Sequence, residues 1–249
     1  MGLHKIVQIL IVVTFLGVYE IATRMHWLDS FTFTPFSTMV LNMVENLSNQ
    51  EYLMNHFGIT ALEILTSFVG AVIFGIIIGI ILWRSDFIHH IFQPYLMLFY
   101  AIPFFALYPI FISIFGVGPF PVIIIGLLFS MPAVITNTAL GFREIRKVLV
   151  KVGLSNNLSF RQMLFYIYFP AAWPLIFTGI KLAAAYSIIG VIATEFILSA
   201  RGIGYTISYA YNNFDLNGMY SSVLLVVVIS LVVNFVLGVI ENKLYQRNV

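Results

Sequence analysis

The sequence predicts an all-helical integral membrane protein with six transmembrane helices in a single domain, residues 1–249. Only 9% of its residues are charged and 61% are hydrophobic, whereas a soluble domain carries about 25% charged residues. A membrane span needs about 20 mainly apolar residues. The stretches that satisfy this requirement are residues 6–23, 59–83, 91–115, 119–140, 171–198 and 220–240.

The basic residues predict that both termini are cytoplasmic. Membrane proteins carry an excess of Lys and Arg in their cytoplasmic loops. With the N-terminus inside, only Arg24 and Arg201 fall outside the membrane and Lys181 falls within a span. The basic residues on the inner side are then Lys5, Arg84, Arg143, Arg146, Lys147, Lys151, Arg161, Lys243 and Arg247.

The first apolar stretch is interpreted as a retained span, because it is long and no small-residue cleavage site follows it. Between the first two spans, residues 36–53 have apolar residues at helical spacing and are expected to lie along the outer surface. Glu20 and Glu63 stand near the outer ends of their spans. We expect both carboxylates at the membrane interface.

The second and third spans carry residues that shape helix packing. Gly75 and Gly79 form a small-xxx-small pattern, which lets helix backbones approach closely. Pro94, Pro103 and Pro109 punctuate the third span. Each proline removes a helical hydrogen bond, so we expect kinks in this span.

The helix of the fourth span is expected to continue beyond the membrane. It would carry Arg143, Lys147 and Lys151 at spacings of four residues on one face. Such a basic stripe is typical of a solvated face near anionic lipid, and it is equally compatible with contact to a partner protein. The spacing leaves both alternatives open.

The interval 151–174 is a short polar loop between apolar segments. Asn tolerates the left-handed conformation, so a chain reversal is expected around Asn157. Ser159 and Gln162 have the spacing of a capping box. A short helix should therefore begin at Ser159 and stop before Pro170, where the fifth span would start. Its exposed faces would carry Phe160, Leu164, Arg161 and Phe165.

This loop resembles the cytoplasmic loop of the permease subunits of binding-protein-dependent ATP-binding cassette (ABC) importers. Their motif runs E-A-A, three residues, G, nine residues, I-x-L-P. Residues 167–170, IYFP, stand at the end of the motif, and Asn157 stands at its Gly. Lys151, Val152 and Gly153 stand at E-A-A, so Gly preserves a small residue while Lys reverses the charge of Glu.

The sequence that follows the loop is similar to the nitrate, sulfonate and taurine branch of that family. The similarity rests on PAAWPLIFTGIKLAAAYSIIGVIATEF from residue 170 and RGIGYTI from residue 201. With the loop, the resemblance runs from about residue 82 to residue 239. It implies a type I importer permease fold in the cell (inner) membrane. The loop, about residues 141–170, would couple the permease to an ATPase.

The resemblance also implies a function and partners. The chain would form the translocation path for a small solute, either an anion like nitrate, sulfonate or taurine or a vitamin of the thiamine-precursor or riboflavin type. Two copies of a cytoplasmic ABC ATPase, a second permease copy and an extracellular or periplasmic substrate-binding protein would be its partners. No G-x-x-x-x-G-K-[ST] loop is present, so no ATPase site or bound cofactor is expected. The expected ATPase-coupling residues are Lys151, Gly153, Asn157, Leu158, Ser159, Phe160, Arg161, Leu164, Phe165, Ile167 and Pro170.

Lys181, Glu195, Tyr100 and Phe104 are candidates for the translocation path. An ionisable residue inside a span is costly and indicates a function. Lys181 either extends its long side chain toward water or pairs with a carbonyl or carboxylate of a neighbouring helix, or it lines the path and attracts anions. Glu195 either faces the path, pairs with Arg201, or caps the turn at residues 202–204. The two aromatic residues either contact a flat solute or pack against lipid.

Two other classes of protein were weighed against this interpretation. A stand-alone secondary carrier or channel would need no partner, but such proteins tend to show paired broken helices in matching halves, and no internal repeat is evident. An intramembrane enzyme would need grouped ligands or nucleophiles. Cysteine is absent and the five histidines do not group with carboxylates, so neither a metal site nor a catalytic residue is expected.

Overall fold

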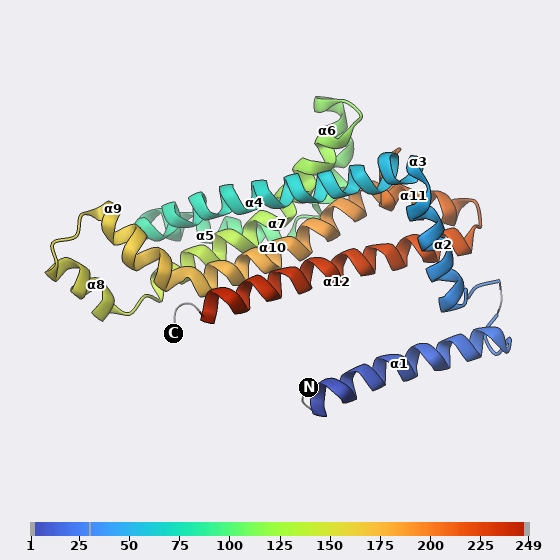
Figure 1. Cartoon of the computed structure of the whole chain (residues 1–249). Helices are drawn as coiled ribbons and strands as arrows, with labels where there is room; N and C mark the ends of the chain where they lie inside the picture. Colours follow the sequence, from blue (N-terminus) through green and yellow to red (C-terminus); the bar gives the residue numbers. More distant parts are fainter. Residues whose placement is uncertain (1–2, 30, 247–249) are drawn as a thin grey trace. The chain divides into compact units, whose positions relative to one another are not determined.

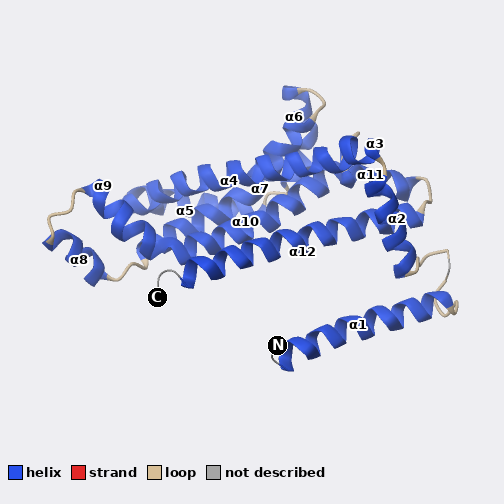
Figure 2. Ribbon diagram, viewed as in Figure 1, coloured by secondary structure: helices blue, strands red, loops and turns tan. Residues whose placement is uncertain are grey.

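The computed structural model describes residues 3–29 and 31–246, which form helices joined by short loops without any strand (Figures 1 and 2). The chain forms two compact units. The first comprises residues 1–60 and 195–229, and the second comprises residues 61–194 and 230–249. Lys5 and Arg247, which contributed to the predicted orientation, have side chains outside the described part of the chain.

Five of the expected spans are present as single long helices. The described helices that are long and apolar enough to cross a membrane are Ile6–Arg24, Gln50–Arg84, Pro119–Arg143, Phe160–Ile197 and Leu216–Lys243. The remaining expected span is a bent pair, so the described residues contain five helices that could cross a membrane, or six spans if the bent pair counts as one. The expected multi-span helical fold is confirmed.

The third expected span breaks into α5 (Asp86–Ala101) and α6 (Tyr108–Phe115). A 3-10 turn, η2 (Phe104–Leu107), joins them, and the two helices meet at 83°. Pro103 directly precedes this turn, and Pro109 lies in the first turn of α6. Since proline cannot donate a helical hydrogen bond, the expected kink becomes a complete break.

The first unit contains α1 (Leu3–Arg24), α2 (Phe36–Ser48), α3 (Gln50–Tyr52), the π turn η1 (Leu53–Phe57) and α11 (Ile203–Asn212). Polar side chains join α1 to α2. The Glu20 carboxylate accepts hydrogen bonds from Arg24 Nε at 2.6 Å and from Ser37 Oγ at 2.7 Å. Of the helix expected over residues 36–53, residues 36–48 form α2, and the extended backbone of Asn49 separates it from α3.

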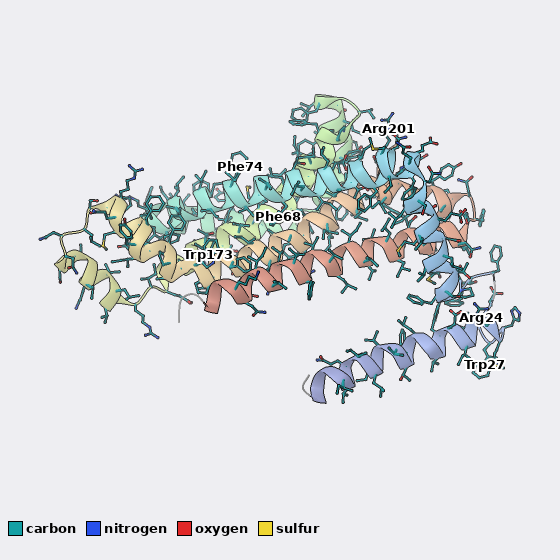
Figure 3. All side chains as sticks on the ribbon, in the orientation of Figure 1. Arg24, Trp27, Phe68, Phe74, Trp173 and Arg201 are labelled. Atoms are coloured by element: carbon teal, nitrogen blue, oxygen red, sulfur yellow. The ribbon has the colours of Figure 1, made fainter. Side chains whose placement is uncertain are left out.

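The second unit is built on α4 (Gly58–Arg84), α7 (Pro119–Arg143) and α10 (Phe169–Leu198). A Cβ atom added to Gly75 would lie 2.6 Å from Val134 Cβ, and one added to Gly79 would lie 2.6 Å from Thr138 Cβ. The small-xxx-small pattern therefore serves close packing of α4 on α7, as expected. Phe74 lies on the opposite, exposed side of α4 (Figure 3).

Glu63, which we expected at the membrane interface, is enclosed by the protein. Its side chain is buried by the protein, with 2% exposed. Glu63 precedes Ser67, Ala71 and Gly75 at steps of four residues, and these three are also buried. Residues four apart share a helix face, so Glu63 lies on the face of α4 that packs inside the protein.

The expected continuous basic helix is also absent. α7 ends at Arg143, residues 144–146 interrupt the helix, and α8 (Lys147–Ser155) begins after them. Arg143 is therefore on a different helix from Lys147 and Lys151. All three side chains are exposed. The spacing of four residues predicts a shared face only where the helix is unbroken.

Candidate functional site

The loop between α7 and α10 is a compact helical hairpin. It consists of α8, the one-turn helix α9 (Phe160–Met163) and the π turn η3 (Leu164–Tyr168), which runs directly into α10. Within the second unit, α8 lies beyond the ends of α4 and α10 (Figure 1). We refer to residues 147–168 as the α8–α9 hairpin.

The turn at the tip of the hairpin has the expected local structure. Asn157 is in the left-handed region, with φ of 53°. The Ser159 amide donates to Gln162 Oε1 at 2.8 Å, and the Gln162 amide donates to Ser159 Oγ at 3.4 Å. These reciprocal bonds form the capping box that the sequence predicts, so α9 begins at the expected place.

Gly153 allows α8 to pack against the rest of the hairpin. It is buried, and a Cβ atom added to it would collide with Met163 Sδ and Ile167 Cδ1. Any larger side chain would push α8 away from α9 and η3. The close approach of two helices thus explains the small residue at this position.

The prediction that the short helix stops before Pro170 is wrong. The helix is continuous from Phe160 into α10, because the turn before the proline is a π turn in which the Phe169 amide donates to the Leu164 carbonyl. In α geometry the proline ring clashes with the carbonyl four residues earlier. A π turn is wider than an α turn. The π turn immediately before Pro170 therefore changes the position of that carbonyl oxygen relative to the ring of Pro170.

The C-terminal end of α4 holds the hairpin at two points. The Trp83 ring lies 4.9 Å from the Tyr168 ring and 4.8 Å from the Phe142 ring, measured between centroids. The Arg84 guanidinium carbon lies 4.3 Å from the centroid of Phe160, within the range of a cation–π interaction. The hairpin is therefore in direct contact with the end of α4.

The hairpin exposes apolar and basic side chains together. Phe160, Phe165 and Arg161 are exposed as expected, whereas Leu164 packs against the core cluster around Phe142 and Ile176. Exposed apolar residues that the sequence analysis did not select are Val148, Leu149, Val152, Leu154 and Tyr166. The spacing of four between the two valines was the signal available for them. Three further residues expected to couple to the ATPase are exposed, namely Lys151, Asn157 and Ser159. Leu158 and Ile167 are partly buried.

Lys181 has a carboxylate partner. Its Nζ donates to Glu241 Oε2 at 2.8 Å, joining α10 to α12 (Leu216–Gln246), and both side chains are partly buried. Pairing with a neighbouring carboxylate was one of the two accounts of this residue. The sequence offered no means to select Glu241, because the two residues are 60 positions apart.

Glu195 caps the N-terminus of α11. Its side chain is 1% exposed, Oε1 accepts from Thr60 Oγ1 at 2.7 Å, and Oε2 accepts from the Gly204 amide at 2.8 Å. Thr60 Oγ1 in turn accepts from the Ile203 amide at 2.8 Å. A Cβ atom at Gly202 would collide with the carboxylate. The first amides of α11 are thus satisfied by side chains, and the helix dipole favours an anion there.

The structure describes the side chain of only one of the two aromatic path candidates. The side chain of Tyr100 lies outside the described part of the structure. Phe104 is buried in a core cluster with Tyr108, Val122 and Ile125. Phe104 therefore packs against other protein side chains in this structure.

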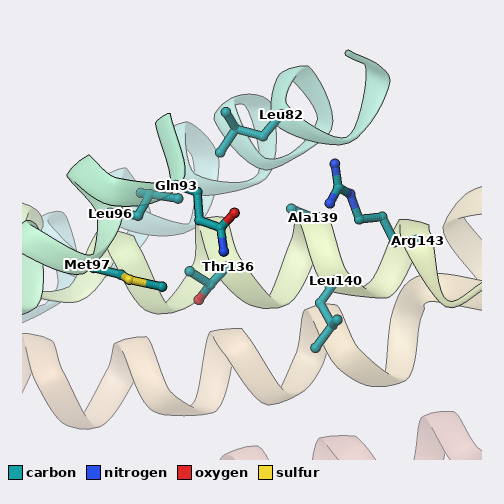
Figure 4. Close-up of a pocket in the computed structure, with 8 residues that line it drawn as sticks. All are labelled: Leu82, Gln93, Leu96, Met97, Thr136, Ala139, Leu140 and Arg143. Carbon is teal, nitrogen blue, oxygen red and sulfur yellow. The ribbon is translucent and has the colours of Figure 1, made fainter. Parts of the chain in front are cut away.

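A cavity of about 310 Å³ lies between α4, α5 and α7 (Figure 4). At its rim, Arg143 donates from a guanidinium nitrogen to Asp86 Oδ1 at 3.1 Å. The sequence analysis did not predict this cavity, because it requires the packing of three helices. Its lining is mainly apolar and comprises Leu82, Gln93, Leu96, Met97, Thr136, Ala139, Leu140 and Arg143.

Residues 71–248 match the family described as binding-protein-dependent transport system inner membrane component. A probable ABC transporter permease protein of Haemophilus influenzae is 26% identical over 94% of this chain and 95% of its own length. The taurine transport system permease protein TauC of Escherichia coli is 23% identical over 77% of this chain and 70% of its own. The nitrate import permease protein NrtB of Synechocystis is 26% identical over 72% and 66%, respectively.

Among solved structures, a chain of the inward-facing MetNI methionine ABC transporter resembles this one with a TM-score of 0.64. The likeness covers 76% of this chain and 94% of that chain, at 18% sequence identity. At this identity the likeness concerns the fold. It confirms the fold class expected from the sequence.

Proposed function

Because the chain belongs to the family of binding-protein-dependent transport system inner membrane components, we propose that its α8–α9 hairpin couples solute passage to a separate ATPase. The chain is a multi-pass membrane permease of the ABC transporter kind. The observation that carries the proposal is the capped, exposed hairpin between two spans, anchored to a third helix through Trp83 and Arg84.

In this mechanism the hairpin inserts into a groove on the ATPase. Phe160 and Phe165 are the apolar anchors, since both are exposed and lie within two turns of each other. An amphipathic helix in a groove is a recurrent mode of recognition. Leu164 supports the hairpin from inside rather than contacting the ATPase. Closure of the ATPase moves the hairpin, and the contacts of Phe160 with Arg84 and of Tyr168 with Trp83 pass the movement to α4.

The proposed assembly contains two permease copies, two ATPase copies and one substrate-binding protein. Both termini and the hairpin lie on the cytoplasmic side, in keeping with the distribution of Lys and Arg. The binding protein delivers solute on the other side. The chain acts as a single transmembrane domain and contributes no ATPase site of its own.

The proposed solute is a small anion, with a vitamin of the riboflavin or thiamine-precursor type as the second candidate. Relatives are named for taurine, nitrate and aliphatic sulfonates, and one is named for riboflavin. Of the four path candidates, Lys181 and Tyr100 remain proposed, whereas Glu195 and Phe104 are buried by the protein in this structure. The Lys181–Glu241 pair leaves little net charge at that point, so we assign most of the selectivity to the binding protein.

The first test is co-purification of the ATPase with the affinity-tagged permease. Phe160→Asp should reduce ATPase recovery by about tenfold or more, because it places a charge in an apolar groove. Val117→Asp is the matched control, since Val117 is an exposed apolar residue in the loop between α6 and α7. Recovery of the ATPase with Phe160→Asp at the wild-type level would refute coupling through the hairpin.

The same complex, reconstituted in lipid, identifies the solute. Its ATPase activity should rise with a binding protein loaded with a sulfonate, taurine or nitrate. A rise only with a vitamin-loaded binding protein would select the second candidate. Solute uptake into vesicles that contain the permease and no ATPase would show a stand-alone carrier instead.

A further inference from the structure

The α8–α9 hairpin and its approach are strongly basic. Between residues 143 and 161 there are five basic residues and one acidic residue, Glu144, so the net charge is +5 − 1 = +4. The Arg143 guanidinium is already paired with Asp86. The four other basic residues are all exposed. They are Arg146, Lys147, Lys151 and Arg161.

The basic residues adjoin the apolar ones on the same surface. On α8, Lys147 and Lys151 are four residues apart, and Val148 and Val152 follow each of them by one. The two lysines form one row along α8 and the two valines form a second row beside it, because residues four apart share a helix face. All four side chains are exposed. On α9, exposed Arg161 follows exposed Phe160 in the same way. Exposed basic and exposed apolar side chains therefore lie in neighbouring rows along α8.

We propose that the ATPase groove that receives this hairpin is rimmed by acidic side chains, which face Lys147, Lys151 and Arg161. The proposal rests on the proposed function, because it names the chemistry of the partner at the same site. Complementary charges at the rim of an interface set specificity and the rate of association. The acidic rim would admit this permease and disfavour permeases whose hairpins carry carboxylates at the same places.

Two observations favour a protein partner over anionic lipid. The hairpin is preformed: Gly153 packs against Met163 and Ile167, and the capping box closes the turn. A preformed surface loses little conformational entropy on binding a shaped groove. In addition, α8 lies beyond the ends of α4 and α10, which are the helices that cross the membrane (Figure 1). The helix α8 thus lies past the level of those helix ends.

The test measures binding of the purified ATPase, identified by the co-purification above, to the permease in nanodiscs. The double variant Lys147→Glu and Lys151→Glu should weaken binding about tenfold at low salt, because attraction becomes repulsion. Wild-type binding should weaken as NaCl is raised, while binding by the double variant should not. Lys243→Glu, an exposed basic residue in the last turn of α12, is the control and should bind like the wild type.

A zero-length carbodiimide cross-link gives an independent readout. It joins a lysine amine to a carboxylate in contact with it, so mass spectrometry should find Lys147 or Lys151 linked to an Asp or Glu of the ATPase. Lys151→Arg should keep the affinity and lose any link through that residue. This pattern cannot arise from a merely structural role of the lysines.

Three results would separate the possibilities. If the double variant binds the ATPase with wild-type affinity and neither lysine is cross-linked, the acidic rim is overturned. If ATPase binding still depends on Phe160 in that case, the coupling proposal remains intact. A loss of binding confined to nanodiscs with anionic phosphatidylglycerol, absent in neutral phosphatidylcholine, assigns the basic residues to lipid and also overturns the rim. ATPase binding that is unchanged by Phe160→Asp overturns the coupling proposal itself.

Discussion

At the scale of single residues, the buried carboxylate of Glu195 shows how an ionisable side chain inside a span acquires a structural task. Its two oxygens accept hydrogen bonds from Thr60 and Gly204, and Thr60 also receives the Ile203 amide. The carboxylate therefore connects the end of α10 to the start of α11 and the start of α4. A functional assignment based only on its depth in a span would have missed this network.

Glu195→Ala should destabilise the protein by about 1–3 kcal/mol, because it leaves the Gly204 amide and the Thr60 hydroxyl without their acceptor in a buried site. The midpoint of thermal unfolding in detergent should fall accordingly. Glu45→Ala, at an exposed position of α2, is the control and should leave the midpoint unchanged. An unaltered midpoint for Glu195→Ala would mean that the cap contributes nothing to stability.

At the scale of elements, the contact between α8 and α9 determines the shape that the hairpin presents. Gly153 lies against Met163 and Ile167, and Trp83 lies against Tyr168. The hairpin is thus packed on both sides, by its own second arm and by α4. This packing holds the two short helices against each other and against α4.

Gly153→Leu should separate α8 from α9, because the added side chain collides with Met163 and Ile167. We expect ATPase recovery in co-purification to fall severalfold, with Gly153→Ala intermediate between leucine and the wild type. Gly17→Leu provides a control, since a Cβ atom there would meet no atom within 4 Å. Full ATPase recovery with Gly153→Leu would contradict a docking role for the packed form of the hairpin.

At the scale of the whole molecule, the orientation in the membrane decides which ends of the helices face the cytoplasm. The distribution of basic residues predicts that the hairpin and the C-terminus lie together on that side. The chain contains no cysteine. Single cysteines can therefore report orientation without background labelling.

Lys243→Cys and Ser155→Cys should be labelled by a membrane-impermeant maleimide only after the cells are opened, whereas Val117→Cys should be labelled in intact cells. All three side chains are exposed, so accessibility does not differ for local reasons. The reverse pattern would invert the proposed topology and remove the hairpin from the reach of a cytoplasmic ATPase. Labelling of all three in intact cells would show that the cells leak and would require a control with an impermeant quencher.

The sequence by itself determined those features that depend on neighbours along the chain. Apolar runs determined the spans, the Ser159 and Gln162 spacing determined the capping box, and Asn157 determined the left-handed turn. Gly75 and Gly79 determined a close helix contact, although not which helix would make it. In each case the physical cause lies within a few residues, so the pattern can be read without knowing the fold.

The tertiary structure alone decided which distant groups meet. Thr60 and Glu195 are 135 positions apart, and Lys181 and Glu241 are 60 positions apart. Burial of Glu63, inward packing of Leu164 and the cavity between α4, α5 and α7 likewise depend on which helix faces which. Hydropathy determines that a helix is apolar on all sides, but only packing against neighbouring helices decides which of its sides is buried.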